Sequence, residues 1–230
     1  MSILESAIGW LAPPQCMICG FEGTALCKTC STSEIEPFGS HCWRCGRLSP
    51  ACRTCQVCRS AGGPRSVWIS SNYGGLPQRL VQLYKFGQHR PASEPIAFIM
   101  TKTFLSMNGP DYEEMNYVVV PVATATSRVR ERGFDHSAIL AKAVAKKLDF
   151  NFCPALGRLG QARQLGSARA DRLKQTKGKY YVRYPELVKG RNILLVDDVI
   201  TTGGTIIAAT QALRLAGARQ IDGLVFAKRL

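Results

Sequence analysis

Apolar and polar positions repeat with two different periods in the larger, second part of the chain, and each period predicts one kind of element. Short apolar runs of strand length predict strands at Val67–Tyr73, Tyr117–Val122, Ile193–Val196 and Ile221–Ala227. Apolar residues at helical spacing predict helices at Leu76–Phe86, Ile96–Met107 and Phe134–Leu148, and from about Thr205 to Leu215. Because strands alternate with helices, the pattern predicts an α/β fold with a mainly parallel sheet covered by helices on both faces.

The N-terminal part of the chain has a different composition, because it is rich in cysteine. Nine of the ten cysteines lie between Cys16 and Cys58. The turn-rich stretch Arg59–Ser66 follows them, and its glycines and proline favour a boundary there. A chain of 230 residues can hold one ordinary domain and a small module. We therefore expect a cysteine-rich module at residues 1–62 and an α/β domain at residues 63–230.

Four CxxC pairs in this module predict two structural zinc sites. Each pair places two thiolates on one side of a tight loop, and two pairs complete the tetrahedral four-sulfur shell that Zn²⁺ prefers. The simplest arrangement is a double zinc ribbon with the ligands Cys16, Cys19, Cys27, Cys30, Cys42, Cys45, Cys55 and Cys58. Cys52 also forms a CxxC pair with Cys55, which leaves an alternative in which Cys58 is the spare thiol. The isolated Cys153 is expected to be a small buried residue.

Hydropathy and charge limit where in the cell the protein is expected and which classes of partner it is expected to bind. No apolar run approaches the ~20 residues that span a bilayer, and the first residues lack the basic start and cleavage site of a secretory signal. We therefore expect a soluble, cytoplasmic protein without membrane insertion, in a compartment where cysteines bind metal instead of forming disulfides. The net charge of +14 favours polyanionic partners, but does not choose among nucleic acid, phosphorylated metabolites and membrane surfaces.

The run Asn192–Thr205 (NILLVDDVITTGGT) combines three features of a phosphate site. A buried strand comes first, and two acids, Asp197 and Asp198, follow it. Because ligands of open α/β sheets bind beyond the carboxyl ends of the strands, we expect both acids at a crevice, where they accept hydrogen bonds from sugar hydroxyls. Small residues then expose backbone N–H groups at the start of a helix, which suits a phosphate. They are Thr201, Thr202, Gly203, Gly204 and Thr205.

Basic residues gather in two further segments that are candidates for binding a polyanion. The arginines of residues 128–132 precede a predicted helix, where they either contact phosphates or form a solvated cluster. Arg158–Arg183 carries eight basic residues and one acid, and it is either a mobile flap or an ordinary exposed loop. Tyr84 is expected in the core and His136 at the surface. The candidate DNA-contacting residues are Lys85, Arg128, Arg130, Arg132, Arg163, Arg169 and Arg172.

The segment LLVDDVITTGGT resembles the signature of the phosphoribosyltransferase family, in which an apolar strand leads into two acids and a Thr/Gly-rich loop. The resemblance implies a type I phosphoribosyltransferase-like sheet that binds phosphoribosyl pyrophosphate together with Mg²⁺. It implies that Asp197 and Asp198 hold the ribose 2′ and 3′ hydroxyls, while Thr201–Thr205 hold the 5′-phosphate. The family's second loop, which contacts pyrophosphate, corresponds to Val120–Ser127 and includes Val122 and Ala123.

The order of the motifs along the chain indicates a particular group of phosphoribosyltransferase-like proteins. Taken together, the motifs resemble the ComF/GntX family over essentially the whole chain. In chain order they are the CxxC pairs, LVQLYKFG, RVRERGFDHS, a polar flap beginning at Arg158, and LLVDDVITTGGT. The RGFNQ of that family appears here as RGFDH, a departure at Asp135 and His136. The family is associated with natural competence, which implies handling of single-stranded DNA and contacts with proteins of the competence machinery.

Two classes of function follow from this resemblance. The first, which we favour, is a binding protein that keeps the phosphoribosyl pyrophosphate site and uses its basic surface on single-stranded DNA. The second is an active phosphoribosyltransferase of nucleotide metabolism, in which Asp197 and Asp198 are catalytic and the acceptor is unknown. Against the enzyme, we expect no base-recognition hood after the last predicted strand and no nucleobase pocket within residues 68–107.

Overall fold

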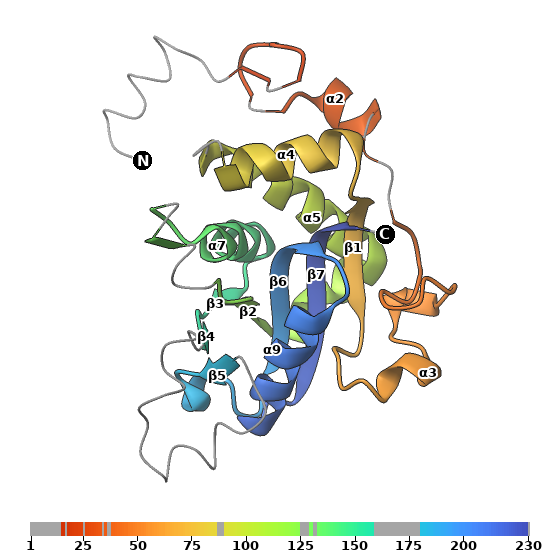
Figure 1. The fold of residues 1–230 in the computed structure, drawn as a ribbon, viewed down its shortest axis with the longest axis vertical. Helices are drawn as coiled ribbons and strands as arrows, with labels where there is room; N and C mark the ends of the chain where they lie inside the picture. Colours follow the sequence, from red (N-terminus) through yellow and green to blue (C-terminus); the bar gives the residue numbers. More distant parts are fainter. Residues whose placement is uncertain are drawn as a thin grey trace.

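The computed structural model describes residues 15–16, 18–24, 26–33, 35, 38–86, 90–124, 129–130, 133–158 and 180–229. Its centre is a five-stranded sheet in the order β1-β7-β6-β2-β3, in which all paired neighbours run parallel. The strands are β1 (Val67–Asn72), β2 (Tyr117–Pro121), β3 (Asn151–Phe152), β6 (Asn192–Ile200) and β7 (Gln220–Lys228). The predicted α/β fold with a parallel sheet is therefore confirmed (Figure 1).

Helices lie at each of the predicted helical segments, with ends that differ by a few residues. They are α4 (Gly75–Phe86), α5 (Ser93–Asn108), α7 (His136–Leu148) and α9 (Gly204–Leu215). The cysteine-rich part contains the short helices α2 (Lys28–Ser33) and α3 (Gln56–Arg59). Short 3-10 turns are found at Pro50–Cys52, Arg90–Ala92, Pro110–Met115 and Pro185–Leu187. A small antiparallel pair, β4 (Leu156–Arg158) and β5 (Tyr180–Val182), borders residues 159–179, which lie outside the described residues.

Side chains of the sheet alternate between two apolar layers. Val119 and Leu194 belong to the layer that contains α4, α5 and α7, whereas their neighbours Val120 and Leu195 belong to the layer that contains α9. Because helices cover both faces, both sets of strand side chains are buried. This burial on two sides explains why the run at residues 193–196 is continuously apolar instead of alternating.

The chain leaves β2 and β6 in opposite directions, although these strands are neighbours. From β2 it passes through α7 to β3, and from β6 it passes through α9 to β7 on the other side. Since α7 and α9 lie in different apolar layers, the two connections separate at the carboxyl ends of β2 and β6. In open parallel sheets, ligands bind where two connections diverge in this way. The topology therefore predicts a ligand crevice between the ends of these two strands.

A buried carboxylate in β7 ties the first residues of the α/β domain to the sheet. Asp222 accepts hydrogen bonds from Nε and Nη2 of Arg65 at 3.1 and 3.2 Å, and from the backbone N–H of Ser66 at 2.9 Å. The hydroxyl of Tyr117 donates to the same carboxylate at 2.6 Å. These donors compensate the cost of burying the charge, so the segment that follows the cysteine-rich residues is fixed to β7 and β2.

One strand is longer than the apolar pattern predicts. β6 runs to Ile200, past the predicted end at Val196, so Asp197 and Asp198 lie within the strand instead of after it. The cause is backbone pairing with β7, which continues from Asp197↔Val225 to Ile200↔Lys228. Polar residues break the apolar pattern but not the ladder of backbone hydrogen bonds. The acids are therefore held more rigidly than residues of a loop would be.

Candidate functional site

The two acids of β6 point to different sides of the sheet. The side chain of Asp198 faces α4 and α7 and is 4% exposed. Asp197 is half-buried, and alternation along a strand directs it to the opposite side. There the charge of Arg158, at the end of β4, acts on it. Only Asp197 therefore has the accessibility that was expected of both acids.

Asp198 is held by a cation from one helix and an imidazole from another. The Nζ of Lys85 in α4 lies 2.8 Å from Oδ1 and 2.8 Å from Oδ2 of Asp198. The Nε2 of His136, at the start of α7, lies 3.3 Å from Oδ2. The hydroxyl of Tyr84 donates to the carbonyl oxygen of His136 at 2.6 Å, which fixes the helix end that presents the imidazole. Asp198 thus joins α4, β6 and α7 at the carboxyl end of the sheet.

These contacts bear on three of the expectations drawn from the sequence. His136, expected at the surface, is 5% exposed, because Asp198 and the ring of Tyr84 enclose it. Lys85 directs its ammonium group to Asp198, and its contact with DNA stays a prediction. Tyr84 is fully buried, as predicted. The signal that could have identified His136 is its place at the first residue of α7, the helix that begins beside the predicted crevice.

The surroundings of the two acids separate their pKa values. Burial and the neighbouring charge of Asp198 raise the pKa of Asp197 to about 8. Burial acts in the same direction on Asp198, but the hydrogen bond from His136 and the charge of Lys85 outweigh it and lower the pKa of that carboxyl. At neutral pH the negative charge of the pair therefore lies mainly on Asp198.

The loop after β6 has two properties of a phosphate site, because it is exposed and it contains the start of a helix. All residues of Thr201–Thr205 are exposed except Gly203, which is buried. Gly203 caps α9 with a φ of 78°, a left-handed conformation that glycine adopts without a steric cost. Because α9 begins at Gly204, its first N–H groups and the positive end of its dipole lie at the carboxyl end of β6. This is the arrangement that binds anions at helix N-termini.

The loop after β2 is described only up to residue 124. Val122 and Ala123 are buried, and the N–H of Val122 donates to the carbonyl oxygen of Val196 at 2.9 Å. The Val122 amide is therefore used by β6 and is not available to a ligand. Residues 125–128 lie outside the described residues, so the contact of this loop with pyrophosphate stays a prediction.

Asp135 fastens the described part of this loop to α7. Its Oδ1 accepts from the hydroxyl of Thr124 at 3.0 Å and from the backbone N–H of Ala138 at 3.2 Å. The second bond is an N-cap, which satisfies one of the unpaired N–H groups at a helix start. The departure from RGFNQ at this position thus has a structural role in this chain.

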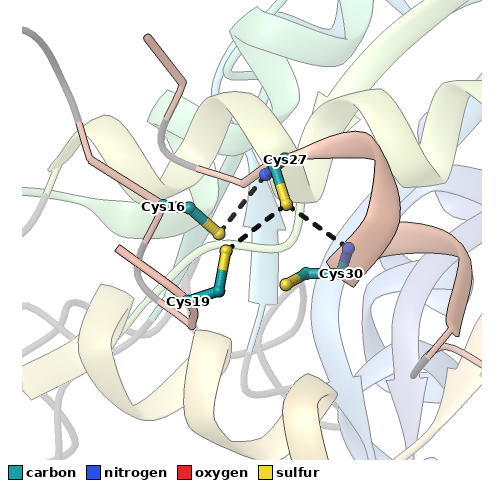
Figure 2. Close-up of side chains that lie close together, drawn as sticks. All are labelled: Cys16, Cys19, Cys27 and Cys30. Atoms are coloured by element: carbon teal, nitrogen blue, oxygen red, sulfur yellow. Dashed lines mark hydrogen bonds between the residues drawn. The ribbon is translucent and has the colours of Figure 1, made fainter. Parts of the chain in front are cut away.

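The eight predicted cysteine ligands form two compact four-sulfur clusters. In each cluster the Sγ atoms all lie within 4.8 Å of one another. One Sγ–Sγ distance in each cluster is 3.6 Å, close to the edge of ~3.8 Å that follows from Zn–S bonds of ~2.3 Å in a tetrahedron. Both clusters therefore fit a four-coordinate metal. The first cluster, drawn in Figure 2, is Cys16, Cys19, Cys27 and Cys30, and the second is Cys42, Cys45, Cys55 and Cys58.

Backbone N–H groups point at the sulfurs in both clusters. The N–H of Cys27 donates to Sγ of Cys16 at 3.4 Å, and that of Cys55 donates to Sγ of Cys42 at 3.5 Å. Burial opposes ionisation of Cys16 and Cys42, but backbone hydrogen bonds outweigh it and lower the pKa of each thiol to about 6. Burial and the Cys55 thiol raise the pKa of Cys58 to about 12. A metal that binds all four sulfurs must therefore displace protons.

The clusters pack against different parts of the α/β domain. Cys16 and Cys27 belong to the apolar layer of α4 and α7, and Figure 1 shows α2 beside α4. Trp43, which lies between two ligands of the second cluster, belongs to the other layer with α9. Cys52 is buried outside both clusters, and Cys153 is buried as predicted.

One of the arginines predicted to contact DNA lies in the described part of the chain. Arg130 is described, and its side chain is exposed. The remaining candidates lie outside the described residues and stay predictions; they are Arg128, Arg132, Arg163, Arg169 and Arg172. Within the described part of the chain, no helix is long and apolar enough to cross a membrane.

Comparison with known proteins supplies the family context of this site. A family model described as phosphoribosyl transferase domain matches residues 135–230, which include both acids and the loop Thr201–Thr205. Competence protein ComFC of Bacillus subtilis (strain 168) is 26% identical over 198 residues, covering 82% of this chain and 77% of that protein. ComFC of Streptococcus pneumoniae (strain ATCC BAA-255 / R6) is 26% identical over 206 residues, covering 87% and 86%. This chain is a ComFC-like protein with a phosphoribosyltransferase domain.

A third relative also matches most of the chain. Competence protein F of Haemophilus influenzae (strain ATCC 51907 / DSM 11121 / KW20 / Rd) is 23% identical over 199 residues, covering 85% of this chain and 81% of that protein. Since the family model begins at residue 135, the part of this ComFC-like chain that holds the cysteine clusters is outside it.

We expect purified protein to carry two Zn²⁺ per chain, because each cluster offers a complete four-sulfur shell. Elemental analysis of protein prepared under reducing conditions without chelators measures this. Replacing Cys16 or Cys42 with Ser should lower the content to one, whereas the matched change Cys52→Ser should leave it at two. A wild-type protein without metal would refute both sites, and a content of one would refute one of them.

Replacing the two acids of β6 with Asn should change stability in opposite directions. At pH 7.5, Asp197→Asn should raise Tm by roughly 2–4 °C, equivalent to about 1 kcal/mol, because a carboxyl with a raised folded pKa must take up a proton on folding when it is ionised in the unfolded chain. Asp198→Asn should destabilise the fold by about 2 kcal/mol or more, since Lys85 loses its buried partner. Thermal unfolding measures both changes.

The pH dependence separates the two effects. The cost of Asp197 grows as pH rises from its unfolded pKa toward its folded pKa of about 8, so the gain of Asp197→Asn should shrink at pH 5. The folded pKa of Asp198 is lowered, so its stabilisation is lost only at more acidic pH, and the loss in Asp198→Asn should persist at pH 5. Equal shifts for both variants at both pH values would contradict the assignment.

Proposed function

We propose that this protein binds phosphoribosyl pyrophosphate with Mg²⁺ between the ends of β2 and β6. One observation carries the proposal: the exposed loop Thr201–Thr205 starts α9 directly after a carboxylate pair, where the chain connections diverge. A phosphate monoester suits the helix start, and sugar hydroxyls suit the acids. The match of the phosphoribosyl transferase domain to residues 135–230 supports this ligand.

Each part of the ligand has its own residues in this proposal. Thr201–Thr205 bind the 5′-phosphate through backbone N–H groups and hydroxyls, and Asp197 and Asp198 hold the ribose hydroxyls. Asp197 is the more accessible acid, whereas Asp198 also keeps Lys85 and His136 in place. The carboxylate and pyrophosphate oxygens suit Mg²⁺, which when bound neutralises the charge of the pyrophosphate.

We propose further that the protein acts in natural competence by handling incoming single-stranded DNA. The ComFC and competence protein F relatives support the process. The net charge of +14 supports a polyanionic partner. The segment of the second cluster adds an exposed basic surface, because no acid occurs between residues 38 and 66, while four arginines there are exposed in addition to Arg65, which pairs with Asp222. They are Arg44, Arg47, Arg53 and Arg59.

A phosphoribosyltransferase with an unknown acceptor is the second candidate. The separated pKa values of Asp197 and Asp198 favour it, because acids whose pKa values are shifted apart are frequent in catalytic sites. In such a reaction an acceptor nucleophile forms a bond to the anomeric carbon of the ribose, and the bond to the pyrophosphate oxygen breaks. Release of pyrophosphate in the presence of candidate acceptors distinguishes the enzyme from the binding protein.

Changing both acids should abolish ligand binding without unfolding the protein. Calorimetry with Mg²⁺ should show that Asp197→Ala/Asp198→Ala binds phosphoribosyl pyrophosphate at least ~30-fold more weakly, a loss of about 2 kcal/mol. Circular dichroism checks the fold, and the exposed pair Glu113→Ala/Glu114→Ala serves as a charge-matched control. Equal affinities of the wild type and the Asp197/Asp198 variant would refute the assignment.

Single-stranded DNA should bind with an affinity that falls steeply as salt rises, at a slope near −0.7 per phosphate contact on a log–log plot. If all three arginines contact phosphates, Arg128→Ala/Arg130→Ala/Arg132→Ala should flatten the slope by about two units. Lys102→Ala/Lys142→Ala/Lys146→Ala removes the same charge from exposed helix positions and should have less effect. An unchanged slope in the arginine variant would exclude this cluster and direct attention to the arginines of the second cysteine cluster.

A further inference from the structure

Trp43, between two ligands of the second cysteine cluster, touches the loop that follows β6. A Cβ atom on Gly203 would stand 2.2 Å from Cζ3 and 2.9 Å from Cη2 of Trp43. The six-membered ring of the indole therefore occupies the space where any other residue would carry a side chain. Gly203 is the buried residue of an otherwise exposed loop. The buried side of the loop thus rests on Trp43.

The indole is itself held in one orientation. Trp43 is 2% exposed, and its Nε1 donates to Oγ1 of Thr54 at 2.8 Å. The hydroxyl of Thr54 donates in turn to the carbonyl oxygen of Pro64 at 2.6 Å. Gly63 also approaches the ring closely, since a Cβ there would lie 2.8 Å from Cζ2. Rotation of the indole would leave a buried N–H without its partner, so the ring is a fixed support.

The second cluster fixes the backbone on both sides of this residue. Cys42 and Cys45 flank Trp43, and the N–H of Gly46 donates to the carbonyl oxygen of Cys42 at 2.9 Å, which closes a tight turn. The Nζ of Lys228 in β7, whose register partner in β6 is Ile200, lies 4.9 Å from the ring centre of Phe38, in the segment that leads into this cluster. The cluster therefore lies at the same end of the sheet as the loop, and a metal bound to its four sulfurs would hold the turn that carries Trp43.

A further contact fastens the end of the second cluster's segment to α9. Nη1 of Arg214 donates to the carbonyl oxygen of Gly62 at 2.9 Å, and Nη2 donates to that of Gly63 at 2.7 Å. The segment thus meets α9 both at its capping residue, through Trp43, and near its last turn, through Arg214. Movement of the cluster relative to α9 is therefore restricted at two points.

We propose that Trp43 is a positioning residue for the loop Thr201–Thr205, so that ligand binding at this loop depends on the metal held by the second cluster. Backbone N–H groups that are already arranged for a phosphate bind it more tightly than a loop that must be ordered by the ligand. The proposal takes the identity of the ligand from the proposed function. The support of the loop by Trp43 does not depend on that identity.

Trp43→Ala tests the proposal through three measurements: zinc content, hydrogen–deuterium exchange of the backbone amides of residues 201–205 without ligand, and calorimetric affinity. Zinc content should match the wild type, while the loop amides should exchange faster. Affinities for phosphoribosyl pyrophosphate with Mg²⁺ and for ribose 5-phosphate should fall by the same factor, about tenfold. The factors should agree because the loop contacts the 5′-phosphate that both molecules share.

Three further variants make the outcome decisive. Trp43→Phe keeps a smaller ring, so it should give intermediate exchange and affinity, and it replaces the alanine variant if that one does not fold. Cys45→Ser should lose the second metal and show both effects. The matched change Cys52→Ser, at a buried cysteine outside both clusters, should show neither.

The results separate this proposal from the proposed function. If the wild type does not bind phosphoribosyl pyrophosphate, the proposed function fails, while the exchange rates still test the support of the loop. Wild-type exchange and affinity in both Trp43 variants would overturn the proposal. Loss of zinc in both variants would overturn it too, because Trp43 would then act on the cluster and not on the loop.

Discussion

A buried negative charge at the end of β6 is the constraint around which the α/β domain is arranged. Asp198 can stay ionised inside an apolar layer only if donors surround it. α4 supplies Lys85 and α7 supplies His136, so one carboxylate fixes the ends of two helices relative to the sheet. Asp197, on the other side of the strand, has no comparable set of partners among the described contacts, and its pKa is raised. One acid thus fixes the ends of α4 and α7, and the other takes no part in this arrangement.

Each cysteine cluster packs against an element of the candidate site. The first cluster packs with α4, the helix that carries Lys85, and the second supports the loop after β6 through Trp43. Segments this short bury too little apolar surface to be stable alone, and a metal bound to the four sulfurs of each cluster would replace the missing core. Both halves of the candidate site, the acids and the phosphate loop, therefore rest on cysteine-rich segments that precede the domain in the sequence.

The apolar pattern was sufficient to predict four of the five strands of the sheet, because these four are buried on both faces and contain few polar residues, whereas the two-residue strand β3, with an exposed Asn151, was not predicted. The strand at residues 193–196 and the CxxC pairs can each be recognised from a few consecutive residues. The choice between Cys52 and Cys58 is not local, since both lie at CxxC distance from Cys55; in the structure the left-handed backbone of Cys52, with a φ of 53°, is part of a turn that buries it outside the cluster.

Contacts between residues far apart in the sequence account for what the pattern did not predict. The burial of His136 depends on Asp198, and the length of β6 depends on pairing with β7. The approach of Trp43 to Gly203 depends on how the second cluster meets α9. Each of these residues has an unremarkable local sequence, so only the assembled fold shows its role.

The packing of Trp43 on Gly203 also has a consequence for how the protein is made. A ribosome produces the second cysteine cluster long before α9 and β7, the elements on which that cluster rests. During this interval no surface is present to cover the indole of Trp43, and the thiols of the second cluster are exposed. Exposed apolar surface of this kind promotes aggregation of incomplete chains. Synthesis of this protein should therefore be sensitive to the supply of metal and of chaperones while the chain is still on the ribosome.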